Sequence, residues 1–230
     1  MKSLRKLYQA NKRLLIDVRE ALINEDLKGP FLMELDEYYQ QSVKLFIIGQ
    51  ESHGWCCEYE NHVALLSTYT DFNMGANHSS PFWNITRKIE NIIGIPSYSC
   101  AWSNINRYDH NGGEPKGEIL NEIRKLDFLV KEELSVIQPD VCFFFTNRKY
   151  DYRLEELFSG LVMQKIEKLP PNHFCRLKHQ DLPSFTFRTP HPITIRTQKW
   201  EELFFSVMKE LLPKAVSTQA SNDIEQKMRK

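Results

Sequence analysis

The feature that most constrains the fold is an apolar run from Val43 to Ile48, which stops at Gly49 and is followed at once by Gln-Glu-Ser-His. The run has the length of a β-strand and lacks an alternation of apolar and polar residues, as expected for a strand covered on both faces. Ligands of open α/β sheets bind outside the carboxyl ends of the strands. The polar residues after Gly49 are therefore candidates for a functional site.

The rest of the chain alternates between strand-like and helix-like patterns. Apolar spacing predicts helices over 3–24, 81–93, 117–137, 152–161 and 198–212, and shorter helices are compatible with 31–39 and with 62–67 inside an irregular segment, 52–80. Further strands are predicted over 97–105 and 141–145. Residues 162–187 are predicted to form alternating strand segments at a sheet edge, such as 162–169 and 184–188, and 189–192 is predicted to be a rigid loop. This order predicts an α/β fold, a three-layer α/β/α sandwich with a mainly parallel central sheet.

Size and charge limit the function classes. The 230 residues are expected to form one domain over 1–213, with the helix of 3–24 packed on it, followed by a polar tail over 214–230. Lys plus Arg and Asp plus Glu both number 30, so the formal net charge is zero. A nucleic acid would have to be bound by a local basic surface, and a strong nonspecific binder is disfavoured.

The cysteines indicate a reducing compartment. The five residues, Cys56, Cys57, Cys100, Cys142 and Cys175, form no C-x-x-C pair, and we expect reduced thiols in a cytoplasmic protein without a bound metal or cofactor. The N-terminus lacks the apolar core of a signal peptide. No run approaches the ~20 apolar residues of a membrane span, so no membrane association is expected.

Three polar clusters lie at the ends of predicted strands: Gly49-Gln-Glu-Ser-His53, Ser103-Asn104 and Pro190-His-Pro192. If the strands are neighbours, the Glu51 carboxylate, the Asn104 amide and the His191 imidazole converge on one cleft. Each residue also has a purely structural explanation. Glu51 is compatible with an ion pair or a helix cap, Asn104 with a capped turn, and His191 with packing between its two prolines.

Five segments, in the same order along the chain, resemble motifs of the uracil-DNA glycosylase superfamily. Gly49-Gln-Glu51 resembles the first motif, apolar–Gly-Gln-Asp-Pro-Tyr and its variants, and Ser80-Pro-Phe-Trp-Asn-Ile85 resembles a Pro-Ser-Leu-x-Asn-Ile helix start. Ala101-Trp-Ser-Asn104 is placed like a strand that ends in Asn. Gln138–Phe145 is similar to the next helix-to-strand passage, and His191-Pro-Ile-Thr194 to the His-Pro-Ser-Pro motif.

The resemblance, over residues 44 to 196, implies a DNA-base glycosylase that removes uracil or a related damaged base by hydrolysis, without a cofactor. It implies that Glu51 positions or activates the attacking water and that His191 donates a hydrogen bond to the leaving base. These groups suit the chemistry, because breaking the N-glycosidic bond develops positive charge on the sugar and negative charge on the base. The base must first be flipped out of the DNA into a pocket.

The resemblance also implies the binding residues. The substrate-binding set is Gly49, Gln50 with its backbone, Phe72 as the ring that stacks on the base, and Asn104 as the reader of the pyrimidine edge. The DNA-backbone set is Ser80, Pro81 and Arg196, with Ile193 beside them and Arg87, Arg107 and Lys199 as further phosphate contacts. The expected partner is DNA, single- or double-stranded, bound by a monomer.

The chain departs from the family motifs at three places. Ser52-His53 stands where Pro-Tyr is usual, so the tyrosine that excludes thymine is absent. An insertion between Gly54 and Phe72 makes Trp55 or Tyr59 a rival stacking residue. Ile193-Thr194 replaces Ser-Pro.

Two alternatives stay open. The first is a catalytically impaired relative that binds nucleic acid or a protein partner without cleaving. The second is a hydrolase that uses Ser52 or Ser103 with His191, which the absence of a G-x-S-x-G nucleophile elbow disfavours.

Overall fold

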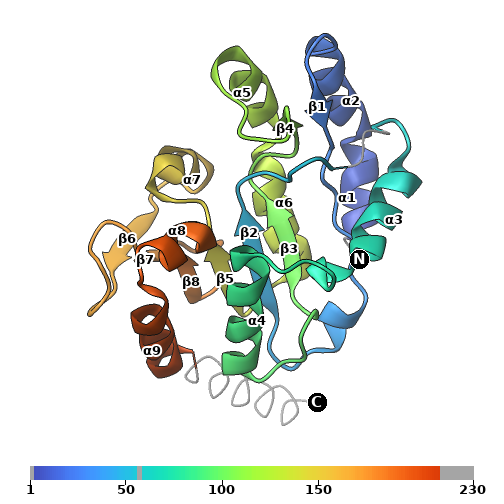
Figure 1. The fold of residues 1–230 in the computed structure, drawn as a ribbon. Helices are drawn as coiled ribbons and strands as arrows, with labels where there is room; N and C mark the ends of the chain where they lie inside the picture. Colours follow the sequence, from blue (N-terminus) through green and yellow to red (C-terminus); the bar gives the residue numbers. More distant parts are fainter. Residues whose placement is uncertain (1–2, 56–58, 213–230) are drawn as a thin grey trace.

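The computed structural model describes residues 3–55 and 59–212. Within these ranges, six strands form one sheet in the order β3-β2-β5-β8-β7-β6 (Figure 1). They are β2 (Leu45–Gly49), β3 (Ala101–Asn104), β5 (Val141–Phe144), β6 (Val162–Lys165), β7 (Cys175–Lys178) and β8 (Phe185–Arg188). The pairs β2–β3, β2–β5 and β5–β8 are parallel, and β7 and β6 extend the sheet antiparallel.

Helices flank this sheet, so the fold is α/β with a mostly parallel centre. The helices are α1 (Leu4–Ala10), α2 (Lys12–Ala21), α3 (His62–Phe72), α4 (Pro81–Ile93), α5 (Gly117–Ile123), α6 (Phe128–Ile137), α7 (Asp151–Leu157), α8 (Pro192–Thr197) and α9 (Glu201–Leu211). In Figure 1, α4, α8 and α9 lie in front of the sheet and α6 lies behind it. A small separate sheet pairs β1 (Leu27–Lys28) with β4 (Asp109–His110).

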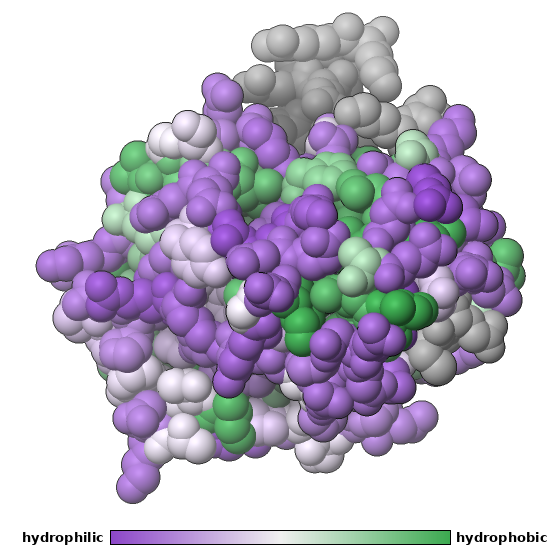
Figure 2. Space-filling model, turned by 90° about the horizontal axis from the view of Figure 1, so that it is seen from above, coloured by the Kyte–Doolittle hydropathy of each residue, from purple (hydrophilic) through white to green (hydrophobic). Residues whose placement is uncertain are grey.

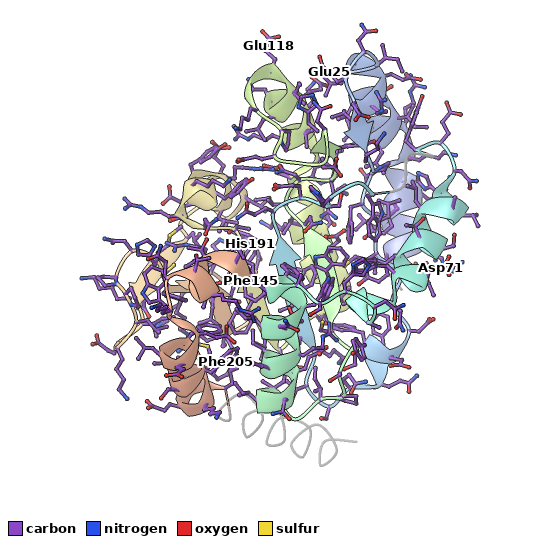
Figure 3. The ribbon with its side chains drawn as sticks, in the orientation of Figure 1. Glu25, Asp71, Glu118, Phe145, His191 and Phe205 are labelled. Atoms are coloured by element: carbon purple, nitrogen blue, oxygen red, sulfur yellow. The ribbon has the colours of Figure 1, made fainter. Side chains whose placement is uncertain are left out.

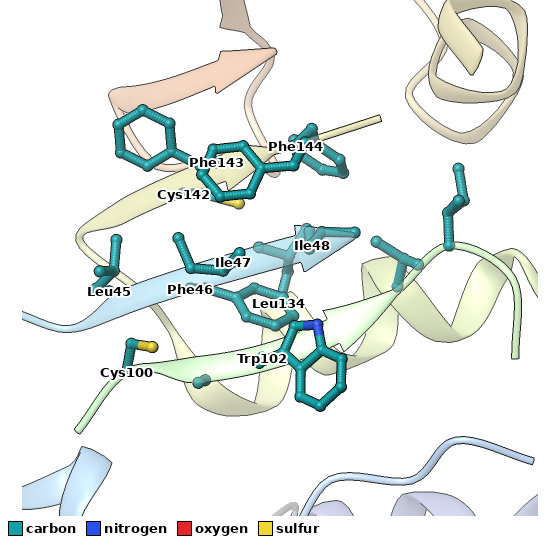
Figure 4. Packing of buried hydrophobic residues seen from close by; sticks show 14 of the residues in the cluster. Leu45, Phe46, Ile47, Ile48, Cys100, Trp102, Leu134, Cys142, Phe143 and Phe144 are labelled. Atoms are coloured by element: carbon teal, nitrogen blue, oxygen red, sulfur yellow. The ribbon is translucent and has the colours of Figure 1, made fainter. Parts of the chain in front are cut away.

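The central strands are buried on both faces, which confirms the expectation from their unbroken apolar pattern. All residues of β2, β3 and β5 are buried. Successive side chains of β5 point to opposite layers: the Phe143 ring packs 6.3 Å from Phe204 of α9, and the Phe144 ring lies 6.5 Å from Phe158 after α7. Figure 4 shows the buried side chains of β2 and β5, among them Ile47 and Phe143. Burying each such side chain contributes about 1.5–3 kcal/mol.

Several element predictions in the N-terminal half were wrong. The helix expected over 3–24 is two helices, because Asn11 breaks it and bonds back through Nδ2 to the Leu7 carbonyl at 2.9 Å. Segment 31–39 is not a helix. Phe31 is buried in a segment that is neither helix nor strand, and its N–H donates to the Arg107 carbonyl at 2.7 Å. Within 31–40 the only helical turn is the 3₁₀ turn Glu37–Gln40.

Further along the chain, most predicted helices and strands are present, but their first and last residues differ from the prediction. The helix inside 52–80 runs to Phe72, and the helix expected over 117–137 is divided by a 3₁₀ turn at Arg124–Leu126. Strand β7 lies within 162–187, where strand segments were expected, but β8 is an inner strand of the sheet and not an edge strand. Helix α8 was not predicted. Helix α8 begins at Pro192, a residue favoured at the first helical position because it has no N–H to satisfy.

Some expectations fall outside the described residues, including those for the tail at 214–230 and for Cys56 and Cys57. Cys100, Cys142 and Cys175 are free and buried. None of the described helices combines the length and apolarity needed to cross a membrane.

Candidate functional site

The carboxyl ends of the parallel strands surround a pocket of about 390 Å³. The chain leaves β2 toward β3 on one side and leaves β5 toward β8 on the other, and such a switch point is where ligands of open sheets bind. The pocket brings together six of the residues predicted from sequence: Gln50, Glu51, Phe72, Ser80, Asn104 and His191. Figure 2 views this side from above, a mainly hydrophilic face with hydrophobic residues gathered in its middle.

Glu51 follows β2 and is held on one carboxylate oxygen. Oε2 accepts a hydrogen bond from Asn106 Nδ2 at 3.2 Å and another from the Tyr150 hydroxyl at 3.3 Å. Burial raises the pKa of Glu51, while the Asn106 hydrogen bond and the positive charge of Lys149 oppose that rise. The result is a carboxyl group fixed in direction and more basic than usual.

Asn106 is itself fixed from behind, by residues that sequence reasoning missed. Arg153 Nη1 donates to Asn106 Oδ1 at 2.7 Å, and Arg153 Nε donates to Asp127 Oδ2 at 2.8 Å. Since Oδ1 is occupied by Arg153, the Asn106 NH₂ group must face Glu51. Asn106 and Arg153 are almost fully buried. The one sequence signal for Asn106 was its position just past the end of a predicted strand.

His191 is a neutral hydrogen-bond donor. It caps α8, and the Ile193 N–H donates to His191 Nδ1 at 3.3 Å, so the proton of the neutral ring is on Nε2. Burial, aided by the charge of Lys149, lowers the pKa of His191 to about 4. The backbone N–H of His191 donates a hydrogen bond to Asn147 Oδ1 at 2.8 Å.

The surroundings of His191 are aromatic. Figure 3 labels His191 and Phe145 in the middle of the molecule. The ring of Phe82, which also lines the pocket, lies 5.9 Å from the His191 ring and 5.5 Å from the Phe145 ring. These rings cover part of the imidazole, and this burial is the main physical origin of its lowered pKa.

Asn104 ends β3 and is 1% exposed. In the amide orientation that satisfies both ends, Oδ1 accepts from the Ser52 N–H and Nδ2 donates to the Ser103 carbonyl, both at 3.1 Å. Gly49 lies against this amide without lining the pocket. A β-carbon at Gly49 would come within 2.4 Å of the Asn104 side chain, so the close approach requires glycine.

Phe72 and Trp55 both line the pocket, together with Trp83 and Trp102. The Phe72 ring lies 5.6 Å from Trp55 and 5.4 Å from Trp102. The other rival stacking residue, Tyr59, is not part of the lining and instead packs its ring under Arg19, 5.5 Å from the guanidinium carbon.

The predicted DNA-backbone residues are spread around the pocket. Ser80 lines it and caps α4, its Oγ accepting from the Trp83 N–H at 3.3 Å. Pro81, the first residue of α4, and Arg196 do not line it. Arg196 is part-exposed on α8, where Nε pairs with Glu201 Oε2 at 3.1 Å.

Two of the further phosphate contacts are corrected by the structure. Arg107 is fully buried and forms an ion pair with Glu133, Nη2 to Oε2, at 2.7 Å, so it is closed to DNA. Arg87 pairs with Glu90 at 2.8 Å and is mostly covered. Lys199 is exposed.

The serine-hydrolase alternative has no supporting geometry. Ser103 is fully buried, where its Oγ donates to Glu133 Oε2 at 3.0 Å and accepts from Arg107. The Ser52 hydroxyl donates to Asp109 Oδ2 at 3.3 Å. In the part of the chain that the structure describes, neither hydroxyl is hydrogen-bonded to a histidine.

Asp109 is a further residue that sequence reasoning missed. Its carboxylate accepts hydrogen bonds from the N–H groups of Gly54 at 2.9 Å and Gly112 at 3.0 Å, in addition to the one from Ser52. The loop after β2 is thereby held over the pocket.

No protein-family model matches this chain, and no curated protein matches it. Among the described residues, no group of three or more His, Cys, Asp or Glu side chains is arranged to hold a metal ion.

Proposed function

We propose that this protein is a DNA-base glycosylase that hydrolyses the N-glycosidic bond of uracil, or of a related damaged base, flipped out of DNA. One observation carries the proposal. A part-buried carboxylate, Glu51, and a neutral imidazole donor, His191, line the same pocket as an aromatic ring, Phe72, and a side-chain amide, Asn104.

The chemistry divides between the two titratable groups. The C1′–N bond breaks with its electron pair going to the base, which leaves a cationic sugar and an anionic base. His191 Nε2–H donates a hydrogen bond to the base, where negative charge develops, and a donor in a water-poor site stabilises that charge strongly. Glu51 orients the water and accepts its proton as the hydroxyl adds to C1′, a task suited to its raised pKa.

Base recognition is assigned to Asn104 and Phe72. The Asn104 amide uses one hydrogen on the Ser103 carbonyl and one lone pair on the Ser52 N–H. It therefore keeps one donor and one acceptor for a ligand. A pyrimidine with a carbonyl next to a ring N–H, as in uracil, complements this pair. Stacking on Phe72 supports the base without reading its identity.

The test is a strand-scission assay. The protein is incubated with single- and double-stranded DNA carrying one uracil, and abasic sites are cleaved with alkali. We expect scission by the wild type, and a loss on the order of 10²–10⁴-fold in Glu51→Gln and His191→Ala. Glu118→Gln and His173→Ala are matched controls at exposed positions and are expected to cleave like the wild type.

The outcomes separate the competing functions. DNA binding without scission by the wild type contradicts the glycosylase and supports the binding-only relative. Turnover of a chromogenic ester without scission of DNA contradicts both. Scission that survives Glu51→Gln contradicts the role given to the carboxylate. A panel of other damaged pyrimidines in place of uracil defines the base.

A further inference from the structure

We infer that Tyr150 is a positioning residue that shares its single hydroxyl proton between Glu51 and Glu114, and that Lys149 decides which carboxylate receives it. The catalytic consequence rests on the proposed function, but the inference itself concerns only the contacts of these groups. Sequence analysis singled out Glu51 but not Tyr150, Glu114 or Lys149.

The Tyr150 hydroxyl lies between two carboxylates. It is 3.3 Å from Glu51 Oε2 and 3.1 Å from Glu114 Oε1. Tyr150 is 2% exposed, so water does not replace either contact at low cost. Asn106 Nδ2 is 3.3 Å from the same hydroxyl oxygen and 3.2 Å from Glu51 Oε2.

The Tyr150 hydroxyl can donate to only one of its two carboxylate neighbours at a time, so one of the two contacts always lacks a hydrogen. Asn106 offers two hydrogens, one to Glu51 and one to the Tyr150 oxygen, because its Oδ1 is taken by Arg153. The Tyr150 hydroxyl has one hydrogen and faces two acceptors. When that hydrogen is directed to Glu114, Glu51 Oε2 keeps only the bond from Asn106. When it is directed to Glu51, Oε2 has two donors.

Lys149 offers Glu114 a second partner. Its Nζ lies 2.8 Å from Glu114 Oε2, at the exposed end of the cluster. Although burial alone would raise the pKa of Glu114, the hydrogen bond and charge of Lys149 lower it overall. Glu114 is thus satisfied as a carboxylate by Lys149, and the Tyr150 hydrogen is released to Glu51.

The groups facing Glu51 come from several elements and act in opposite directions. Burial and the negative charge of Glu114 raise its pKa, and Asn106, Lys149 and Tyr150 lower it. His53 and His191 line the same pocket, and Arg153 with Asp127 lies behind Asn106. Removing Glu114 should therefore lower the pKa of Glu51, whereas removing Lys149 or the Tyr150 hydroxyl should raise it.

The direct test measures Glu51 in the full chain without DNA. The protein is labelled with ¹³C at the Glu side-chain carboxyl carbon, and the signal of Glu51 is identified as the one lost in Glu51→Gln. We expect the pKa of Glu51 to fall in Glu114→Gln and to rise in Lys149→Met and Tyr150→Phe. The controls Glu118→Gln, Lys178→Met and Tyr152→Phe, all at exposed positions, should leave it in place. Thermal melting of each variant confirms that it is folded.

Activity supplies an independent readout. In the pH profile of kcat/KM for uracil-containing DNA, the acidic limb should move to lower pH in Glu114→Gln and to higher pH in Tyr150→Phe, so that at a pH on this limb the first variant is several-fold faster than the second. A loss that is uniform across pH would indicate only a structural role and contradicts the inference.

The two proposals fail separately. If the wild type cleaves no DNA but the Glu51 signal moves in the expected order, the glycosylase proposal is wrong and the proton sharing stands. If the Glu51 signal titrates identically in all three variants, the proton sharing is wrong, whatever the enzyme does.

Discussion

At the scale of single residues, His191 shows how surroundings set chemistry. A histidine between two prolines carries no sequence signal for its protonation state. The Ile193 N–H bonded to Nδ1 and the aromatic rings around the imidazole decide that it is neutral, with its proton on Nε2. A neutral imidazole can donate a hydrogen bond to an atom on which negative charge develops and still keep its proton.

We predict that His191 stays neutral down to acidic pH and that this makes stability depend on pH. Its pKa is about 4 in the folded protein against 6.5 when solvated, so the unfolded chain takes up the proton first as pH falls. The stabilising contribution is therefore complete above pH 6.5 and is lost as pH falls toward 4.

The measurement is imidazole ¹⁵N NMR together with urea unfolding at pH 7 and pH 5. His191→Gln should lose less stability between these two pH values than the wild type does. A His191 ring that titrates near 6.5, or carries its proton on Nδ1, would contradict the prediction.

The residue scale also shows where prediction from sequence stops. Glu51, Asn104 and His191 were predictable because each lies at or just past the end of a strand-like segment and within one of the five motifs of the resemblance. Asn106 and Tyr150 were not, since their contacts with Glu51 span 55 and 99 residues of chain and depend on the arrangement of the sheet. Arg107 was expected to contact phosphate because charged side chains are normally exposed. Its buried ion pair with Glu133 contradicts that expectation.

At the scale of elements, one buried network joins the N-terminal helix to the sheet. The Tyr8 hydroxyl of α1 donates to Glu133 Oε1 of α6 at 2.7 Å and accepts from the Met33 N–H at 3.1 Å. Arg107, just past β3, completes the network through two further hydrogen bonds of 2.7 Å to Glu133. Every member is fully or nearly fully buried, so each polar group depends on the others.

We predict that Arg107→Met destabilises the protein by about 3–5 kcal/mol, because Glu133 would be left buried without its charge partner. The double variant Arg107→Met with Glu133→Leu should recover much of that loss, since no unpaired charge remains. Urea unfolding measures both.

The control is Arg13→Ala, which removes an exposed ion pair to Asp17 and should cost less than about 1 kcal/mol. Two outcomes would show that the buried pair does not hold these elements together. In the first, Arg107→Met is at least as stable as Arg13→Ala. In the second, the double variant is less stable than Arg107→Met.

At the scale of the whole molecule, the balance of charge bears on DNA binding. Lys plus Arg equals Asp plus Glu at 30 each, and several cations near the pocket are already paired, such as Lys149 with Glu114 and Arg196 with Glu201. The protein therefore has no global field to attract a polyanion. If it acts on DNA as proposed, the binding free energy must come from the flipped base and a few phosphates.

We predict a shallow salt dependence of DNA affinity. Because each phosphate contact adds about −0.9 to the slope of log K against log salt, the slope should be smaller in magnitude than about 4. Fluorescence anisotropy with an oligonucleotide measures it. A slope of about −6 or steeper would reveal a basic surface that the charge balance does not indicate.

The sequence by itself determined the parallel sheet, the order of its central strands along the chain and the polar residues at their ends. These features depend on the pattern of apolar and polar residues within each short segment, and that pattern can be read from the segment alone. Only the tertiary structure decided which polar side chains meet, which arginine is buried, which nitrogen of His191 holds the proton and which acceptors compete for the Tyr150 hydrogen. The physical reason is that desolvation and hydrogen-bond partners are set by groups distant in sequence, so they exist only once the layers have packed.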